Sequence, residues 1–135
     1  MRHALPIAII SGMICGCAST ASQLEDSERT PTCEAGHECS TKWYAAEKWI
    51  TEQAHRLIVH KTDNVMRTAA NWSRSPEAAI YVRRVRTAPG EYRIEARMKC
   101  GNLAGCDPDP AEALRRFNRY VNQSWIELPK KDSKE

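Results

Sequence analysis

Residues 78–100 carry the pattern that most restricts the fold of this chain. In the segment YRIEARMKC, apolar and charged side chains alternate, which places them on opposite faces of a β-strand. The apolar set is Tyr92, Ile94, Ala96 and Met98. The preceding segment AAIYVRRVRT is also strand-like, and the turn sequence APGE lies between the two segments. The sequence therefore predicts an antiparallel hairpin with its apolar face buried.

The first arm of this hairpin departs from strict alternation. Ile80 and Val82 share a face, but Val85 is out of phase with them. One extra residue in the strand would restore the phase, so we expect a β-bulge near Arg83 and Arg84.

Two other segments have the spacing of amphipathic helices. Apolar side chains recur every three or four positions in residues 40–58, and Ser40 or Thr41 is the expected N-cap. A second helix should begin at Asp109, which precedes a proline at the first helical position and a glutamate at the third. Its expected buried stripe consists of Ala113, Leu114, Phe117, Tyr120 and Val121.

The segment between the first helix and the hairpin is less regular. Residues 57–69 are interpreted as a short strand, a turn at Asp63-Asn64, and a second short strand near 65–68. All these elements together predict an α+β fold. We expect a small antiparallel sheet whose apolar face packs against an N-terminal and a C-terminal helix. Trp43 and Trp49 are interpreted as core anchors, with a ligand platform as the alternative.

The first residues of the chain, MRHALPIAIISGMICGC, have the organisation of a secretory signal. A short basic start precedes an apolar stretch, residues 4–13, that is too short to span a bilayer as a stable helix. The chain is therefore expected to be exported.

The end of this signal resembles the lipobox of bacterial lipoproteins. Ile14, Cys15 and Gly16 occupy the three positions before Cys17, the cysteine that receives lipid in that class. The resemblance implies that residues 1–16 are removed and that Cys17 carries three acyl chains, enough for stable anchoring. Ala18 is not the aspartate that retains such proteins at the inner membrane. The implied location is the cell envelope, at the periplasmic face of the outer membrane.

Four further cysteines lie in two local pairs, each flanked by turn residues. An exported chain meets an oxidising compartment, so we expect the disulfides Cys33–Cys39 and Cys100–Cys106. A bridge between the two ends of the domain, such as Cys39–Cys100, is the alternative connectivity. These cysteines with His37 could also hold zinc, but the C-x3-H-x-C spacing does not match a standard zinc site.

Length and composition predict one domain. The expected boundaries are a signal at 1–16, a lipidated cysteine and flexible tether at 17–38, a single domain at 39–128 and a charged tail at 129–135. The formal net charge is +3, and loss of Arg2 with the signal lowers it by one. A charge this small does not argue for a nucleic-acid partner.

The sequence contains none of the common catalytic or cofactor motifs. We find no P-loop, no G-x-G-x-x-G, no G-x-S-x-G and no H-E-x-x-H, so we expect neither an enzyme nor a cofactor. The lone His60 is interpreted as structural or solvated.

The outer face of the hairpin is the one surface with a marked composition. We expect basic side chains to cluster there because adjacent strands bring them within reach of one another. The predicted set is Arg84 (or Arg83), Arg86, Arg93, Arg97 and Lys99. The expected function is a non-enzymatic interaction or accessory module at the envelope. The alternative is an anion-binding module for lipid headgroups, lipopolysaccharide or an acidic protein.

Overall fold

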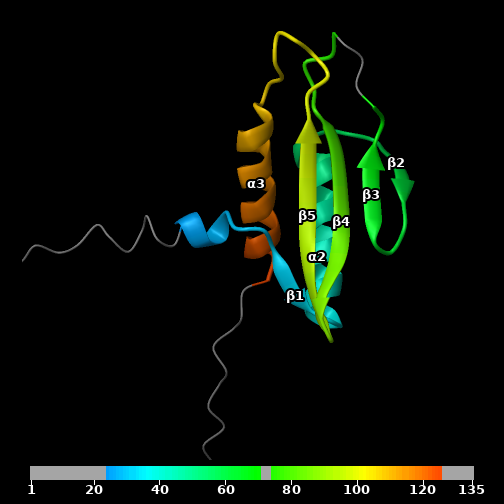
Figure 1. Ribbon diagram of the computed structural model, residues 1–135, viewed down its shortest axis with the longest axis vertical. Helices are drawn as coiled ribbons and strands as arrows, with labels where there is room; N and C mark the ends of the chain where they lie inside the picture. Colours follow the sequence, from blue (N-terminus) through cyan, green and yellow to red (C-terminus); the bar gives the residue numbers. More distant parts are fainter. Residues whose placement is uncertain (1–23, 71–73, 126–135) are drawn as a thin grey trace, which may run out of the picture.

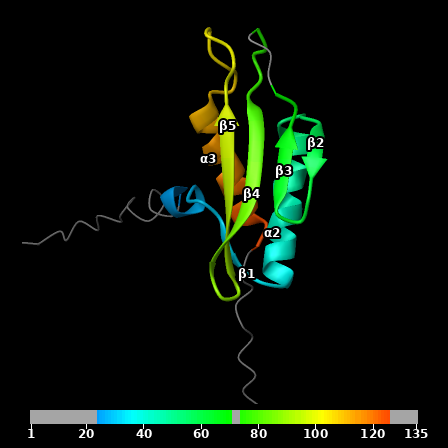
Figure 2. The ribbon, with the colours of Figure 1, turned by 45° about the vertical axis from the view of Figure 1, so that its right-hand side comes forward.

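A five-stranded antiparallel sheet is built around the predicted hairpin. The structure, a computed structural model, describes residues 24–70 and 74–125. Its strands are β1 (Thr32–Glu34), β2 (Ile58–Lys61), β3 (Val65–Thr68), β4 (Ala79–Ala88) and β5 (Glu91–Lys99). They lie in the order β1-β5-β4-β3-β2, so the long β4–β5 hairpin forms the centre and short strands flank it (Figures 1 and 2).

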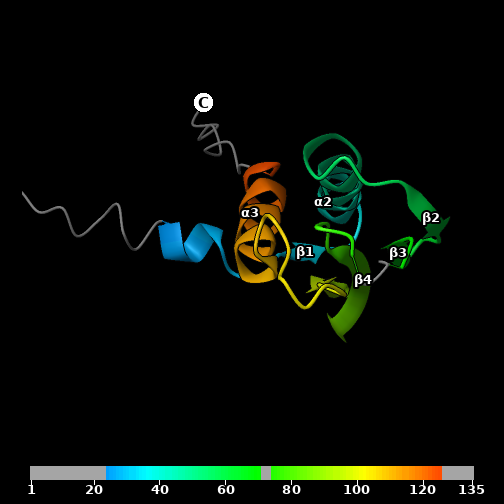
Figure 3. The same ribbon diagram turned by 90° about the horizontal axis from the view of Figure 1, so that it is seen from above.

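Two helical segments cover one face of this sheet. The first is α2 (His37–Lys48), which continues directly as the π-helix η1 (Trp49–Gln53), and the second is α3 (Pro110–Gln123). Seen from above, α2 and α3 lie on the same side of the strands (Figure 3). The predicted α+β fold, with both helices on the apolar face of the sheet, is confirmed.

The two helices begin in different ways, and only α3 has a side-chain cap. A carboxylate oxygen of Asp109 accepts from the N–H groups of Ala111 and Glu112, at 3.0 and 3.4 Å, as predicted for α3. The predicted cap of α2 at Ser40 or Thr41 is wrong, because the helix begins earlier, after Gly36. Gly36 adopts φ 104°, and the Ser40 hydroxyl donates to the Gly36 carbonyl at 2.9 Å, from within the helix.

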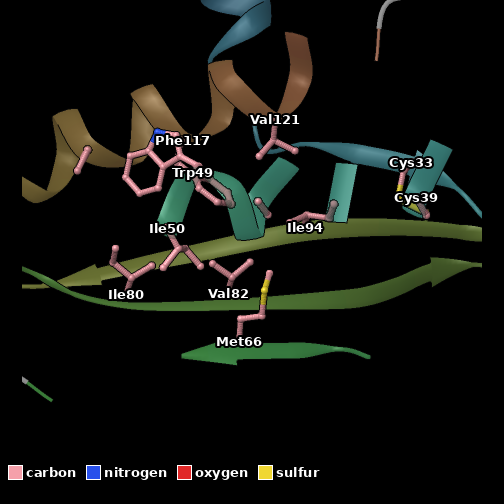
Figure 4. Packing of buried hydrophobic residues seen from close by; sticks show 12 residues of the cluster. Cys33, Cys39, Trp49, Ile50, Met66, Ile80, Val82, Ile94, Phe117 and Val121 are labelled. Atoms are coloured by element: carbon pink, nitrogen blue, oxygen red, sulfur yellow. A yellow bond between two sulfur atoms is a disulfide. The ribbon is translucent and has the colours of Figure 1, made fainter. Parts of the chain in front are cut away.

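The core lies between the helices and the sheet (Figure 4). Its largest fully buried side chains are Ile50, Met66, Val82, Ile94, Phe117 and Val121. Trp49 meets Phe117 edge to face, with ring centroids 5.4 Å apart. Trp49 is therefore a core residue, and Trp43 packs against the same cluster from a half-buried position.

Both predicted disulfides are present. Cys33–Cys39 joins β1 to the first turn of α2, and Cys100–Cys106 closes the loop between β5 and α3. The four sulfur atoms are bonded in pairs, so they are not the free thiolates that the zinc alternative requires.

The domain begins earlier than the predicted boundary at residue 39. Strand β1 pairs with β5, and Pro31 is fully buried. The side-chain amides of two asparagines on α3 hold the preceding segment: Asn118 donates to the Glu28 carbonyl, and Asn122 donates to the carbonyls of Ser27 and Arg29, each at 2.8 Å. The segment from Ser27 to Glu38, predicted as tether, is therefore part of the folded domain.

The predicted bulge near Arg83 and Arg84 is also wrong. Strands β4 and β5 pair without interruption from Ala79 to Arg86, and Val85 lies opposite Arg93 on the uncovered face. Arg84 instead lies on the inner face of the sheet, opposite Ile94. Its guanidinium carbon lies 5.6 Å from the centroid of the Trp43 ring and 5.4 Å from that of Tyr92. Stacking on two aromatic rings lets a charged residue occupy the inner face without a shift in phase.

Candidate anion-binding face

The face of the sheet opposite the helices is open. Within residues 24–70 and 74–125, no element packs over it, and its basic side chains are exposed except for the half-buried Arg83. We call it the open face, defined by Arg67, Tyr81, Arg83, Arg93, Glu95, Arg97 and Lys99.

Strand pairing brings two arginines to either side of one tyrosine on this face. Arg67 of β3 lies directly opposite Tyr81 of β4, and Tyr81 lies opposite Arg97 of β5. His60 of β2 lies opposite Arg67 and extends the same row to the edge of the sheet. Because neighbouring strands are about 4.8 Å apart, the backbones of the two arginines are about 10 Å apart. A bulky anionic group could contact both guanidinium groups at once.

Three cations of the open face have no ion-pair partner among the described residues. They are Arg67, Arg97 and Lys99, and all three are exposed. Lys99 lies opposite Ala79, next to the row formed by Arg67, Tyr81 and Arg97. Unpaired guanidinium groups are available for bidentate contacts to phosphate or carboxylate oxygens.

Glu95 neutralises a different part of the face. The Arg83 Nε donates to one carboxylate oxygen at 2.8 Å, and the Arg93 Nε donates to the other at 2.6 Å. The hydrogen bond from Arg83, followed by that from Arg93, holds the pKa of Glu95 below its ordinary value. Arg93 therefore belongs to the open face, but it is already ion-paired with the carboxylate of Glu95.

The predicted basic cluster requires a correction. Arg93, Arg97 and Lys99 share the open face, but Arg84 and Arg86 lie on the side of the helices, opposite Ile94 and Tyr92. The Nε of Arg86 donates to the Ala88 carbonyl at 3.4 Å, at the end of the hairpin.

Sequence reasoning missed Arg67 and Tyr81 as members of this face. The alternation in the segment VMRT was the available signal. If the apolar Met66 points into the core, as it does in the structure, then Arg67 beside it must point outward. The predicted lipidation site, Cys17, lies outside the described residues.

No helix within 24–70 or 74–125 has the length and apolar character needed to cross a membrane. Comparisons of the chain with known proteins found no matching family model, no matching curated protein and no matching solved structure.

Proposed function

We propose that this chain is a lipid-anchored envelope protein without enzymatic activity, an accessory module whose open face binds an anionic membrane surface. The observation that carries the proposal is the row formed by Arg67, Tyr81 and Arg97, with Lys99 beside it. These exposed cations have no carboxylate partner among the described residues. Arginine in this setting favours phosphate oxygens, which membrane headgroups supply.

The position of the lipid anchor favours a membrane over a soluble partner. Only residues 18–23 separate Cys17, the proposed lipidation site, from the described segment that begins at Leu24. A fully extended chain covers at most about 3.5 Å per residue, so this link can span no more than roughly 25 Å. The domain would therefore stay close to the headgroups, and a basic residue near an anionic surface contributes about 1 kcal/mol. An acidic protein is the alternative partner for the same face.

Sedimentation with lipid vesicles tests the proposal. The protein is the chain from Ala18 onward, exported so that its disulfides form and without the lipidated cysteine. We expect retention on vesicles that contain phosphatidylglycerol, no retention on pure phosphatidylcholine, and loss of retention as salt increases. Replacing two cations, Arg67→Gln with Arg97→Gln, should weaken partitioning by about 30-fold.

A control pair separates the open face from overall charge. Arg29→Gln with Arg86→Gln removes the same charge from positions outside the open face. If this control loses as much binding as the first pair, the open face is not the binding site. If wild type shows no retention even at low salt, membrane binding through this face is wrong.

A further inference from the structure

A pocket of ≈490 Å³ opens at one end of the domain, away from the open face. It lies where η1 meets the start of α3 and the first residues of β4. Its floor is apolar and consists of Trp49, Ile80, Met98 and Ala113. Trp49 and Ile80 lie at the same end of the core in Figure 4. This volume is within the range of small-molecule pockets, roughly 300–1,000 Å³, and such pockets are mostly apolar with a few polar groups.

The backbone along one wall of this pocket is irregular in two ways. Trp49 and Gln53, the first and last residues of the π-helix η1, both line the pocket. His55, two residues further, also lines it and has φ 51°, in the left-handed region that favours glycine. π-helical turns and strained non-glycine residues occur frequently at functional sites. Both irregularities lie in the same segment that shapes the pocket.

The charges around the pocket favour an acidic ligand group at one position. Among the charged residues that line it, Arg56 is the one most removed from solvent, with a side chain that is 14% exposed. Its guanidinium pairs with the carboxylate of Glu77, whose own side chain is 53% exposed. A half-solvated carboxylate can move into water at little cost, and the planar guanidinium can then donate to another acid in its place.

We propose that this pocket binds a small amphipathic acid. Its apolar body lies on the floor formed by Trp49, Ile80 and Met98, and its carboxylate or sulfonate binds Arg56 in place of Glu77. This second site shares no residue with the open face, so it stands or falls independently of membrane binding.

Binding of 8-anilinonaphthalene-1-sulfonate, followed by fluorescence, tests this site in the exported chain from Ala18 onward. We expect one saturable site, and we expect decanoate to displace the dye at much lower concentration than decanol does. Glu77→Gln removes a carboxylate that competes for Arg56 and should tighten dye binding by about tenfold. Glu91→Gln, an equal charge change at the exposed hairpin turn, should leave it unchanged.

Two neighbouring alanines provide a steric test. Ala78 lines the pocket, whereas Ala79 lies opposite Lys99 on the other side of the sheet. Ala78→Trp should abolish saturable dye binding, and Ala79→Trp should retain it, with thermal unfolding confirming that both variants fold. Unchanged binding in folded Ala78→Trp would overturn the proposal. If that variant does not fold, equal dye affinity in Glu77→Gln and Glu91→Gln would overturn it.

Discussion

The charged pair of Lys42 and Glu38 connects the first turns of α2 to β1. The Lys42 ammonium is buried and donates to the Thr32 carbonyl and to Glu38 Oε1, each at 2.7 Å. Glu38 also accepts from the Glu34 N–H at 2.9 Å. Burial raises the pKa of Glu38, but hydrogen bonds from Lys42 and Glu34, with the charge of Lys42, outweigh it and lower the pKa overall. A carboxylate thus fixes an edge strand to a helix.

Glu38→Gln should therefore change how stability depends on pH. A lowered folded-state pKa means that the stabilisation is fully present above the ordinary value of 4.5 and is lost as pH falls through the lower folded value. We expect Glu38→Gln to cost about 1 kcal/mol at neutral pH and to lose less stability than wild type on acidification below pH 4.5. Urea unfolding at several pH values measures both effects.

Glu52→Gln is the matched control. Glu52 pairs with Lys48 at 3.6 Å on an exposed surface of the same helical segment. Equal pH dependence in the two variants would show that the Lys42–Glu38 pair has no special role.

The two disulfides hold different kinds of structure. Each closes a loop with a sequence separation of 6. Cys33 and Cys39 are buried in the core between β1 and α2, whereas Cys100 and Cys106 are half-buried in a loop. Loss of chain entropy in the unfolded state should stabilise the fold equally for both disulfides, but only Cys33–Cys39 also fills volume in the core.

Removing the two disulfides should therefore have unequal effects. Cys100→Ala with Cys106→Ala should cost about 2 kcal/mol, the loop-entropy value. Cys33→Ala with Cys39→Ala should cost at least about 1 kcal/mol more, because it also removes buried sulfur atoms. Chemical denaturation of the two double variants measures the difference. Equal losses would mean that the core around β1 tolerates the missing sulfurs.

Local sequence patterns predict most of the helices and strands, but they do not predict which strands pair when the strands are far apart in sequence. The hairpin, the cap of α3 and both disulfides follow from residues close together in sequence. Strand β1 has only three residues, too few for an alternating pattern, and its partner β5 lies far along the chain. The row of Arg67, Tyr81 and Arg97 depends on the register of three strands, which alternation within each strand does not determine.

The two proposed sites occupy separate regions of the domain. The open face lies on the sheet, and the pocket lies at the junction of η1, α3 and β4. The described chain begins beside α3, where Asn118 and Asn122 hold residues 27–29. The proposed anchor would therefore attach to a fixed point of the domain through only a few residues.

Lipid attachment at Cys17 predicts a specific mass. The protein extracted from membranes should have the mass of residues 17–135 plus three acyl chains, and it should gain about four daltons when both disulfides are reduced. Intact-mass spectrometry with and without reduction measures this. Cys17→Ser should abolish the added mass, and Cys15→Ser should keep it. Lipid that survives Cys17→Ser would place the anchor elsewhere.

The lengths of the outer strands affect how copies of this protein can coexist. The sheet ends in β1, with three residues, and in β2, with four residues and an irregular register. Each of these two outer strands offers few free backbone groups to a neighbouring sheet. If the proposed anchor holds the molecules on a membrane surface, they would meet one another often, and outer strands this short would disfavour edge-to-edge pairing between copies.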